Sequence, residues 1–231
     1  MSGSLATLSL AVCAFVGGHI LFAGTPLRAM LVELVGGEGR FRGVFSLFSA
    51  VTLLWVIMAY AAAPYVMVWP DAHWTRGIPV LVMPFACILI VAGLSTPSPT
   101  AVGGERAAES STPVSGILRI TRHPFLWGVT LWAVAHGIAN GDAASLTLFG
   151  GMAVLALGGM PSIDAKVARR LGAAWGPIAL SSSILPFAAI LRGQTRLSLG
   201  EIGWMRLLGG LALYALLVLV HPWITGKPVF F

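Results

Sequence analysis

Apolar runs of membrane length follow one another along the chain, separated by short polar or proline-containing segments. About 20 apolar residues span the hydrocarbon core of a bilayer as an α-helix, and roughly 17 is the lower limit. The pattern therefore predicts an all-α, polytopic membrane helix bundle with about six transmembrane spans. The predicted spans are residues 5–24, 44–60, 77–94, 124–140, 143–160 and 202–220.

The segments between the spans predict surface structure. Residues 95–115 are rich in proline, serine and glycine, which indicates a mobile surface linker rather than a site. Pro161 is expected to close the fifth span. Residues 162–176 place an apolar stripe opposite basic side chains, as in an interfacial amphipathic helix. Residues 181–191 predict a second short helix, either re-entrant or on the surface.

Composition supports a membrane protein and excludes several other classes. The chain is 57% hydrophobic and 10% charged, whereas soluble domains have about 25% charged residues. Its 231 residues suit one bundle, so residues 1–231 are predicted to form a single transmembrane domain. Cys13 and Cys87 both lie in apolar runs, and this predicts neither a disulfide framework nor a zinc site.

The distribution of basic residues predicts the orientation in the membrane. Twelve lysines and arginines fall in or beside the loops after the first, third and fifth spans, and only Arg76 and Lys227 fall on the opposite side. Because basic loops favour the cytoplasm, both termini are predicted to be periplasmic. Orientation also accounts for the net charge of +6, so the partner we expect is the lipid bilayer and not nucleic acid.

The fourth predicted span carries the strongest candidate for a functional residue. His136 lies among apolar residues, where an imidazole needs a hydrogen bond, a packed interior position or a ligand. Gly128, Trp132 and His136 recur at intervals of four, so they share one helical face that we expect to look inward. The alternative for His136 is a packed core histidine bonded to a neighbouring helix.

Other polar residues near the spans are further candidates. His19 lies in the first span, His123 at the cytoplasmic boundary and His221 near the outer boundary. Two interpretations of His123 remain, a cap at the membrane boundary and a functional role. Two also remain for His221, a ligand and an interfacial anchor. Arg122 and Arg28 suit carboxylate or phosphate oxygens, and lipid headgroups are their alternative partners.

Four segments resemble the NnrU-like integral membrane proteins: GHILFAGTPLR, FRGVFSLFSAVTLLW, TRHPFLWGVTLWAVAHGIANGD and HPWITG. Bacterial members are associated with nitrite and nitric oxide reduction, so the resemblance implies a bacterial cytoplasmic membrane protein linked to denitrification. The related 15-cis-zeta-carotene isomerases are haem b proteins. The resemblance therefore implies haem b bound by His136 and His19. His221 is a rival partner for His136, because both lie toward the outer side of the predicted topology. Arg122 and Arg28 are candidate partners of the haem propionates, and His123 is a further candidate cofactor-binding residue. Ala133 replaces a cysteine of the isomerase motif.

A second resemblance points to different chemistry. RHPFLWG is similar to the RHPxYxG segment of isoprenylcysteine and phospholipid methyltransferases, and residues 164–187 resemble their later region. This implies an S-adenosylmethionine pocket around His123 and Trp175, although Leu126 replaces the tyrosine.

Three hypotheses follow from these features. The first is a haem b membrane protein of the NnrU type with a redox or isomerase-like role, served by a redox partner protein or a lipid-soluble substrate. The second is an S-adenosylmethionine-dependent membrane methyltransferase. The third is a non-catalytic membrane subunit or assembly factor. The sequence has no Walker loop, GxSxG or HExxH motif that would indicate another enzyme class.

Overall fold

The computed structural model describes residues 3–70, 72–101 and 103–230, and these residues are helical or irregular, with no strand beyond an isolated bridge between Met67 and Asp142. The predicted all-α class is confirmed. Five helical segments are long and apolar enough to cross a membrane: residues 5–23, 38–62, 74–95, 143–181 and 204–225. The remaining predicted span, the fourth, is α6, Pro124–Asn140, whose 17 residues are near the lower limit for crossing a bilayer.

The chain divides into two compact units, which are described separately. Unit 1 comprises residues 1–78 and 133–159, and unit 2 comprises residues 79–132 and 160–231. Helices α4, α6 and α7 each contribute residues to both units.

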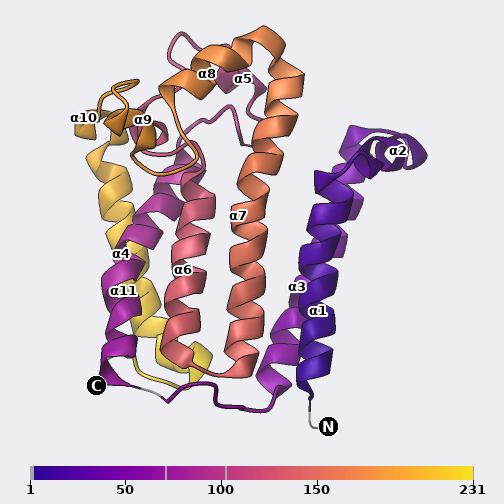
Figure 1. Ribbon diagram of the computed structural model, residues 1–231, viewed down its shortest axis with the longest axis vertical. Coiled ribbons are helices and arrows are strands. Elements are labelled where there is room, and N and C mark those ends of the chain that lie inside the picture. The colour runs from indigo at the N-terminus through magenta and orange to yellow at the C-terminus, as the bar shows by residue number, and fades with distance from the viewer. Residues whose placement is uncertain (1–2, 71, 102, 231) are drawn as a thin grey trace. The chain divides into compact units, whose positions relative to one another are not determined.

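Unit 1 is built on two long helices that run side by side (Figure 1). Helix α1, Leu5–Gly18, continues into a π-helical turn, His19–Ala23, and α3 extends over Glu38–Ala62. Between them lies α2, Leu27–Leu34. Gly36 and Gly37 follow α2 with φ of 80° and 121°, backbone angles that glycine adopts without strain. The Gly36-Gly37 pair therefore lets the chain turn between α2 and α3.

Small residues allow the helices of unit 1 to approach closely. A Cβ atom at Gly18 would overlap the Phe48 ring of α3, and one at Gly151 of α7 would overlap Val12 of α1. Such contacts are typical of helix packing in membranes, where dispersion replaces the hydrophobic effect as the attraction between helices. Helix α1 therefore packs against both α3 and the first half of α7.

In unit 2, residues 79–95 of α4 pack against two other helices. Helix α4 is His73–Ser95, and α11 is Trp204–Thr225. A Cβ at Gly128 of α6 would lie 2.8 Å from the carbonyl oxygen of Ala86, and one at Gly210 of α11 would lie 2.5 Å from Cα of Ile88. Helix α4 is therefore packed between α6 and α11, and the inward direction predicted for the Gly128 side of α6 is confirmed.

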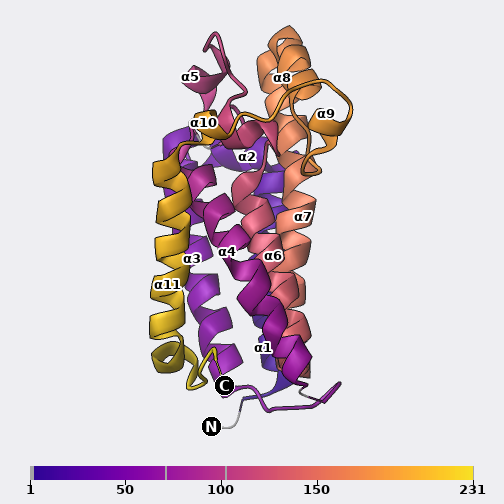
Figure 2. The ribbon, with the colours of Figure 1, turned by 90° about the vertical axis from the view of Figure 1, so that its left-hand side faces the viewer.

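Short helices gather at one end of unit 2 (Figure 2). They are α5 (Glu105–Ala108), a 3-10 turn (Gly116–Arg119), α8 (Trp175–Ser181), α9 (Ala188–Leu191) and α10 (Leu199–Ile202). The 3-10 turn, α8 and α10 contribute to an apolar cluster made by Ala92, Val114, Ile117, Leu118, Ile178 and Ile202. This end of the unit therefore has a hydrophobic core of its own.

Two predictions about helix ends are wrong. Helix α7 is Ala143–Leu171 and passes through Pro161, so residues 162–171 continue the fifth span instead of forming a separate helix. Helix α11 likewise continues past the predicted end at residue 220, through Pro222 to Thr225. A proline removes only one N–H from the helical ladder, and transmembrane helices tolerate this where neighbouring groups satisfy the freed carbonyl.

The prediction of a mobile linker over residues 95–115 is also wrong for much of that segment. Thr96, Ser98 and Pro99 are buried. Thr100 Oγ1 donates a hydrogen bond to the carbonyl of Arg122 at 2.9 Å, and Arg170 donates one to the carbonyl of Pro99 at 3.1 Å. Composition suggested mobility, but buried polar groups that find partners can hold a polar segment in place.

Candidate functional site

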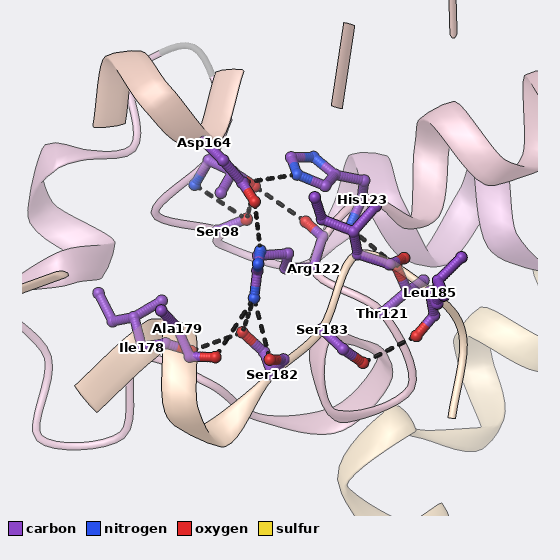
Figure 3. A network of polar contacts seen from close by, with 12 residues as sticks. Ser98, Thr121, Arg122, His123, Asp164, Ile178, Ala179, Ser182, Ser183 and Leu185 are labelled. Carbon is purple, nitrogen blue, oxygen red and sulfur yellow. Dashed lines mark hydrogen bonds and ion pairs between the residues drawn. The ribbon is translucent and has the colours of Figure 1, made fainter. Parts of the chain in front are cut away.

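A network of charged side chains joins the start of α6 to the later part of α7 (Figure 3). Nε of Arg122 lies 2.8 Å from Oδ2 of Asp164, and Nε2 of His123 lies 2.7 Å from Oδ1 of the same carboxylate. The side chains of Arg122 and Asp164 are each 13% exposed, and that of His123 is 2% exposed. Buried charges are retained where they are paired and hydrogen-bonded, and here Asp164 is bonded on both oxygens.

The segment between α8 and α9 holds this network in place. Residues 182–184 turn their carbonyl groups toward the start of α6. Arg122 donates to the carbonyl of Ser182 at 2.9 Å, and Thr121 Oγ1 and Trp127 Nε1 donate to the carbonyl of Ile184 at 2.7 and 2.8 Å. The Arg122 guanidinium also lies over the Trp175 ring, 5.4 Å from its centroid, a favourable cation–π position. The orientation of Arg122 is therefore fixed from several sides.

A cavity of about 680 Å³ opens beside this network within unit 2. Its lining includes Arg106, Arg122 and His123, together with residues 93–98 and Phe125. Pockets that bind small molecules typically measure about 300–1,000 Å³. The site is thus large enough for a small organic ligand or a lipid headgroup, and part of its wall comes from the segment that the sequence had suggested was only a linker.

His123 presents one ring nitrogen to this cavity. Its Nε2 is bonded to Asp164, and among the described residues Nδ1 has no hydrogen-bond partner. In the described part of the chain, every buried side-chain nitrogen or oxygen that solvent cannot reach has a partner. Solvent therefore reaches Nδ1, and His123 is one of the residues that line the cavity. A histidine oriented by a carboxylate, with its other nitrogen open, can accept, donate or transfer a proton.

Asp164 is the member of this candidate site that the sequence analysis did not single out. It was noted only as part of a methyltransferase-like region, yet it binds both Arg122 and His123. The signal that could have found it is a carboxylate inside a helix of apolar and basic residues, since acids in such positions are usually paired. The structure also brings together the two segments that resemble the methyltransferases.

His19 lies elsewhere, in unit 1, at the start of the π-helical turn. Its Nδ1 lies 2.7 Å from the carbonyl oxygen of Phe15. A carbonyl can only accept, so Nδ1 carries the proton and a neutral ring keeps its lone pair on Nε2. Ser49 Oγ is 3.4 Å from Nε2, but that hydroxyl donates its single proton to Phe45 at 2.7 Å. Nε2 of His19 therefore keeps a lone pair of the kind that binds a metal.

His136 also belongs to unit 1, and its ring lies 5.4 Å from that of Phe149 in α7. Helices α1 and α7 run in the same direction (Figure 1) and touch at Val12 and Gly151. His19 lies seven residues after Val12 on α1, and Phe149 lies two residues before Gly151 on α7. The difference in depth between His19 and Phe149 is therefore nine residues of helix, about 13 Å of rise.

These positions test how well the residues fit a haem. His19 fits as an axial ligand, because its Nδ1 bond to a carbonyl is the usual orientation for a metal-binding imidazole. His136 lies at a different depth of the same unit, so both rings reach one iron only after a shift along the helices. Ligation of haem b by both histidines stays a prediction.

The remaining candidates have local partners. Arg28 pairs with Glu38 and lies over the Phe41 ring, 5.1 Å from its centroid, in unit 1. His221 Nδ1 contacts the carbonyl of Lys227 at 2.8 Å, where it helps to close the end of α11. Neither residue belongs to the Arg122–His123–Asp164 network. Their proposed roles beside a cofactor stay predictions.

The helical spans and the buried charged network define a multi-pass helical membrane protein. The chain matches the family model described as NnrU protein over residues 7–229, and it belongs to the NnrU family. The predicted family is therefore confirmed.

Two plant proteins are similar to part of the chain. The chloroplastic 15-cis-zeta-carotene isomerase of Zea mays is 34% identical over 83 residues, which cover 36% of this chain and 23% of that protein. The same enzyme of Arabidopsis thaliana is 35% identical over 80 residues, covering 35% of this chain and 22% of the relative. The similarity thus spans less than a quarter of these curated relatives. No solved structure matches the chain.

Proposed function

We propose that this NnrU-family protein has an isomerase-like role on a lipid-soluble substrate in the membrane, with haem b as its redox group. The observation that carries the proposal is the similarity to two 15-cis-zeta-carotene isomerases, at 34% and 35% identity. A polyene substrate dissolves in the hydrocarbon core of the bilayer. The apolar helices of this chain are long enough to cross that core, so the substrate would reach the protein from within the membrane. The proposed setting is the bacterial cytoplasmic membrane, in support of nitrogen-oxide metabolism.

The residues proposed to hold the haem are His19 and His136, and the proposal requires a shift along the helices that brings the two rings to one depth. His19 is oriented by the Phe15 carbonyl and packed against Phe45, whose ring centroid lies 5.0 Å from that of the imidazole. The π-helical turn that begins at His19 adds support, because such turns occur frequently at functional sites. When bound, haem b would supply one-electron chemistry whose potential depends on its axial ligands and on burial.

The experiment is a visible absorption spectrum of the protein purified in detergent, oxidised and then reduced with dithionite. Three variants accompany the native chain: His19→Ala, His136→Ala and, as the matched control, His221→Ala. We expect a Soret band with sharp reduced α and β bands in the native chain and in His221→Ala. Loss of one imidazole at His19 or His136 should remove the low-spin spectrum, because two imidazoles give a low-spin b-type centre.

Other results would overturn parts of the proposal. A colourless protein, purified folded from cells with ample haem, would exclude haem b. A spectrum that changes with His19→Ala but not with His136→Ala would remove His136 from the ligand set. For the isomerase-like role, the haem-loaded protein is mixed with 15-cis-zeta-carotene and the isomers are separated by chromatography. An unchanged isomer ratio at stoichiometric protein would exclude that substrate.

The methyltransferase and assembly-factor hypotheses stay predictions. The contact between the start of α6 and residues 164–187 favours the first of them, because it joins both segments of the methyltransferase resemblance. Saturable binding of S-adenosylmethionine that is lost in His123→Gln would support methyl transfer. Loss of a partner complex on deletion of the gene, with a protein that carries no cofactor, would support an assembly role.

A further inference from the structure

The cavity beside His123 offers an open ring nitrogen and the positive charge of an arginine to one ligand. His123 is 4% exposed, and its Nδ1 is the only ring nitrogen that Asp164 leaves open. Arg106 lines the same cavity and is exposed, and it makes no hydrogen bond or ion pair within the described chain. No aspartate or glutamate is among the described residues that line the cavity. Among its described residues, the cavity lining therefore presents an open imidazole nitrogen and a positive charge, with no carboxylate.

The carboxylate of Asp164 does not neutralise the charge of Arg106 in the cavity, because it is already paired with Arg122. The carboxylate of Asp164 is matched by the guanidinium of Arg122, at 2.8 Å, so the two charges offset each other locally. The charge of Arg106 has no such partner among the described residues, so an anionic ligand would supply one. Hydrogen bonds between ionised partners are the strong ones, and phosphate and carboxylate are the groups that arginine and histidinium bind best.

One wall of the cavity is apolar and continues to the outside of the unit. Leu94 and Phe125 line it and are 71% and 39% exposed. These two residues lie at the ends of α4 and α6, where the hydrocarbon-spanning helices meet the polar segment 95–108. A ligand with a charged head and a hydrocarbon tail would find a polar wall and an apolar exit in the same cavity, as amphiphiles do at a membrane boundary.

We propose that the cavity lined by residues 93–98, Arg106 and the start of α6 binds the anionic headgroup of an amphiphile, a phosphate or carboxylate on a hydrocarbon tail. In this site, Arg106 pairs with the charge of the headgroup, and Nδ1 of His123 is a second polar contact for it. Phe125 and Leu94 contact the tail. The site is separate from the proposed haem ligands, which belong to unit 1.

The test is calorimetric titration of the protein in an uncharged detergent with dihexanoyl phosphatidic acid. Dihexanoyl phosphatidylcholine has the same tails with a zwitterionic head, and inorganic phosphate has the anion without a tail. Arg106→Ala and His123→Gln change the site, and Arg192→Ala is the control, since it removes an exposed arginine that does not line the cavity. We expect saturable binding of phosphatidic acid that weakens about tenfold in each site variant and is unchanged in Arg192→Ala.

Each alternative result is decisive. Equal binding of phosphatidylcholine would overturn the anionic character of the site, and equal binding of inorganic phosphate would overturn the need for a tail. Tighter binding of S-adenosylmethionine would assign the cavity to that cofactor instead. Weakening by the same factor in Arg192→Ala would mean that general surface charge attracts the lipid. Because Arg106 is exposed, its replacement tests the site even if His123→Gln fails to fold, and the readout does not depend on haem.

Discussion

Nε2 of His123 lies 2.7 Å from Oδ1 of Asp164, although 41 residues separate the two in the chain. The contact joins the residue before α6 to the later part of α7, and Arg122 bonds the other oxygen of the same carboxylate. One acidic side chain therefore holds two neighbouring basic residues at the boundary between a membrane span and the polar end of unit 2.

Replacing Asp164 should be strongly destabilising. Asp164→Asn removes the charge that offsets Arg122, and both side chains are 13% exposed. Breaking a buried pair by removing one partner typically costs about 3–5 kcal/mol, so we expect a clear fall in the midpoint of thermal unfolding in detergent. Glu109→Gln is the control, because it removes an exposed acid from the same unit. Equal midpoints for the two variants would contradict a structural role for the network.

Replacing Gly128 even with alanine should lower the free energy of unfolding. A Cβ there would lie 2.6 Å from Cγ1 of Ile90 and 2.8 Å from the backbone oxygen of Ala86. Gly128→Ala must therefore push α6 away from α4, and overpacking of this kind costs about 1–3 kcal/mol. Gly150→Ala is the matched control in an exposed helical position, with nothing within 4 Å of the new methyl group. Chemical unfolding of both variants would test this, and a stable Gly128→Ala would show that the helices are not in close contact.

The turn between α6 and α7 should depend on Gly141. Its φ is 64°, and a Cβ would lie 2.7 Å from the Trp69 ring and 2.8 Å from the carbonyl of Trp69. The same turn accepts backbone hydrogen bonds from Val68 and Trp69 at 2.9 and 3.1 Å. Left-handed backbone costs a residue with a side chain about 1–2 kcal/mol, and the clash adds to this in Gly141→Ala.

Gly158→Ala provides the comparison for this substitution. Gly158 is exposed in α7, and nothing lies within 4 Å of the place that a methyl group would occupy there. We expect its thermal midpoint to match or exceed that of the native chain, because alanine favours helix more than glycine does. A midpoint for Gly141→Ala as high as that of Gly158→Ala would disprove the packing of Trp69 against the turn.

Protonation of Glu201 at acidic pH should lower the stability of the polar end of unit 2. Its carboxylate accepts from Arg119 Nε at 2.7 Å and from the N–H of Gly116 at 2.9 Å. The Arg119 hydrogen bond, followed by that of Gly116, lowers the pKa of Glu201 below its ordinary value. In the unfolded chain, Glu201 binds a proton at a higher pH than it does in the folded chain. The charged Glu201 carboxylate therefore stabilises the fold fully above about pH 4.3, its ordinary pKa. This contribution is lost as the pH falls through the lowered pKa of the folded state.

The measurement is the difference in thermal midpoint between the native chain and Glu201→Gln, followed from neutral to acidic pH. We expect the native chain to be more stable at neutral pH, and the difference to shrink once Glu201 is protonated. A difference that stays constant down to the most acidic point would mean that the carboxylate charge contributes nothing.

The sequence by itself determined the class of the protein and much of its helical plan. Apolar runs predicted the spans because transfer into hydrocarbon depends on local composition and length, and a backbone in lipid must bond to itself. Regular spacing placed Gly128 on an inward face, since helical period is a local property. The turn at Gly36 and Gly37 was equally readable, because the need for positive φ belongs to single residues.

The tertiary structure decided what depends on partners distant in the chain. Helix α7 continues through Pro161 and the polar segment after α4 is packed, although local composition suggested a break and a mobile loop. Asp164 gained its role only when folding brought it to His123. The bond of His19 to Phe15 likewise fixed which ring nitrogen stays open. Local preference sets where helices form, whereas the burial of a polar group is favourable only with a particular partner, and folding alone supplies that partner.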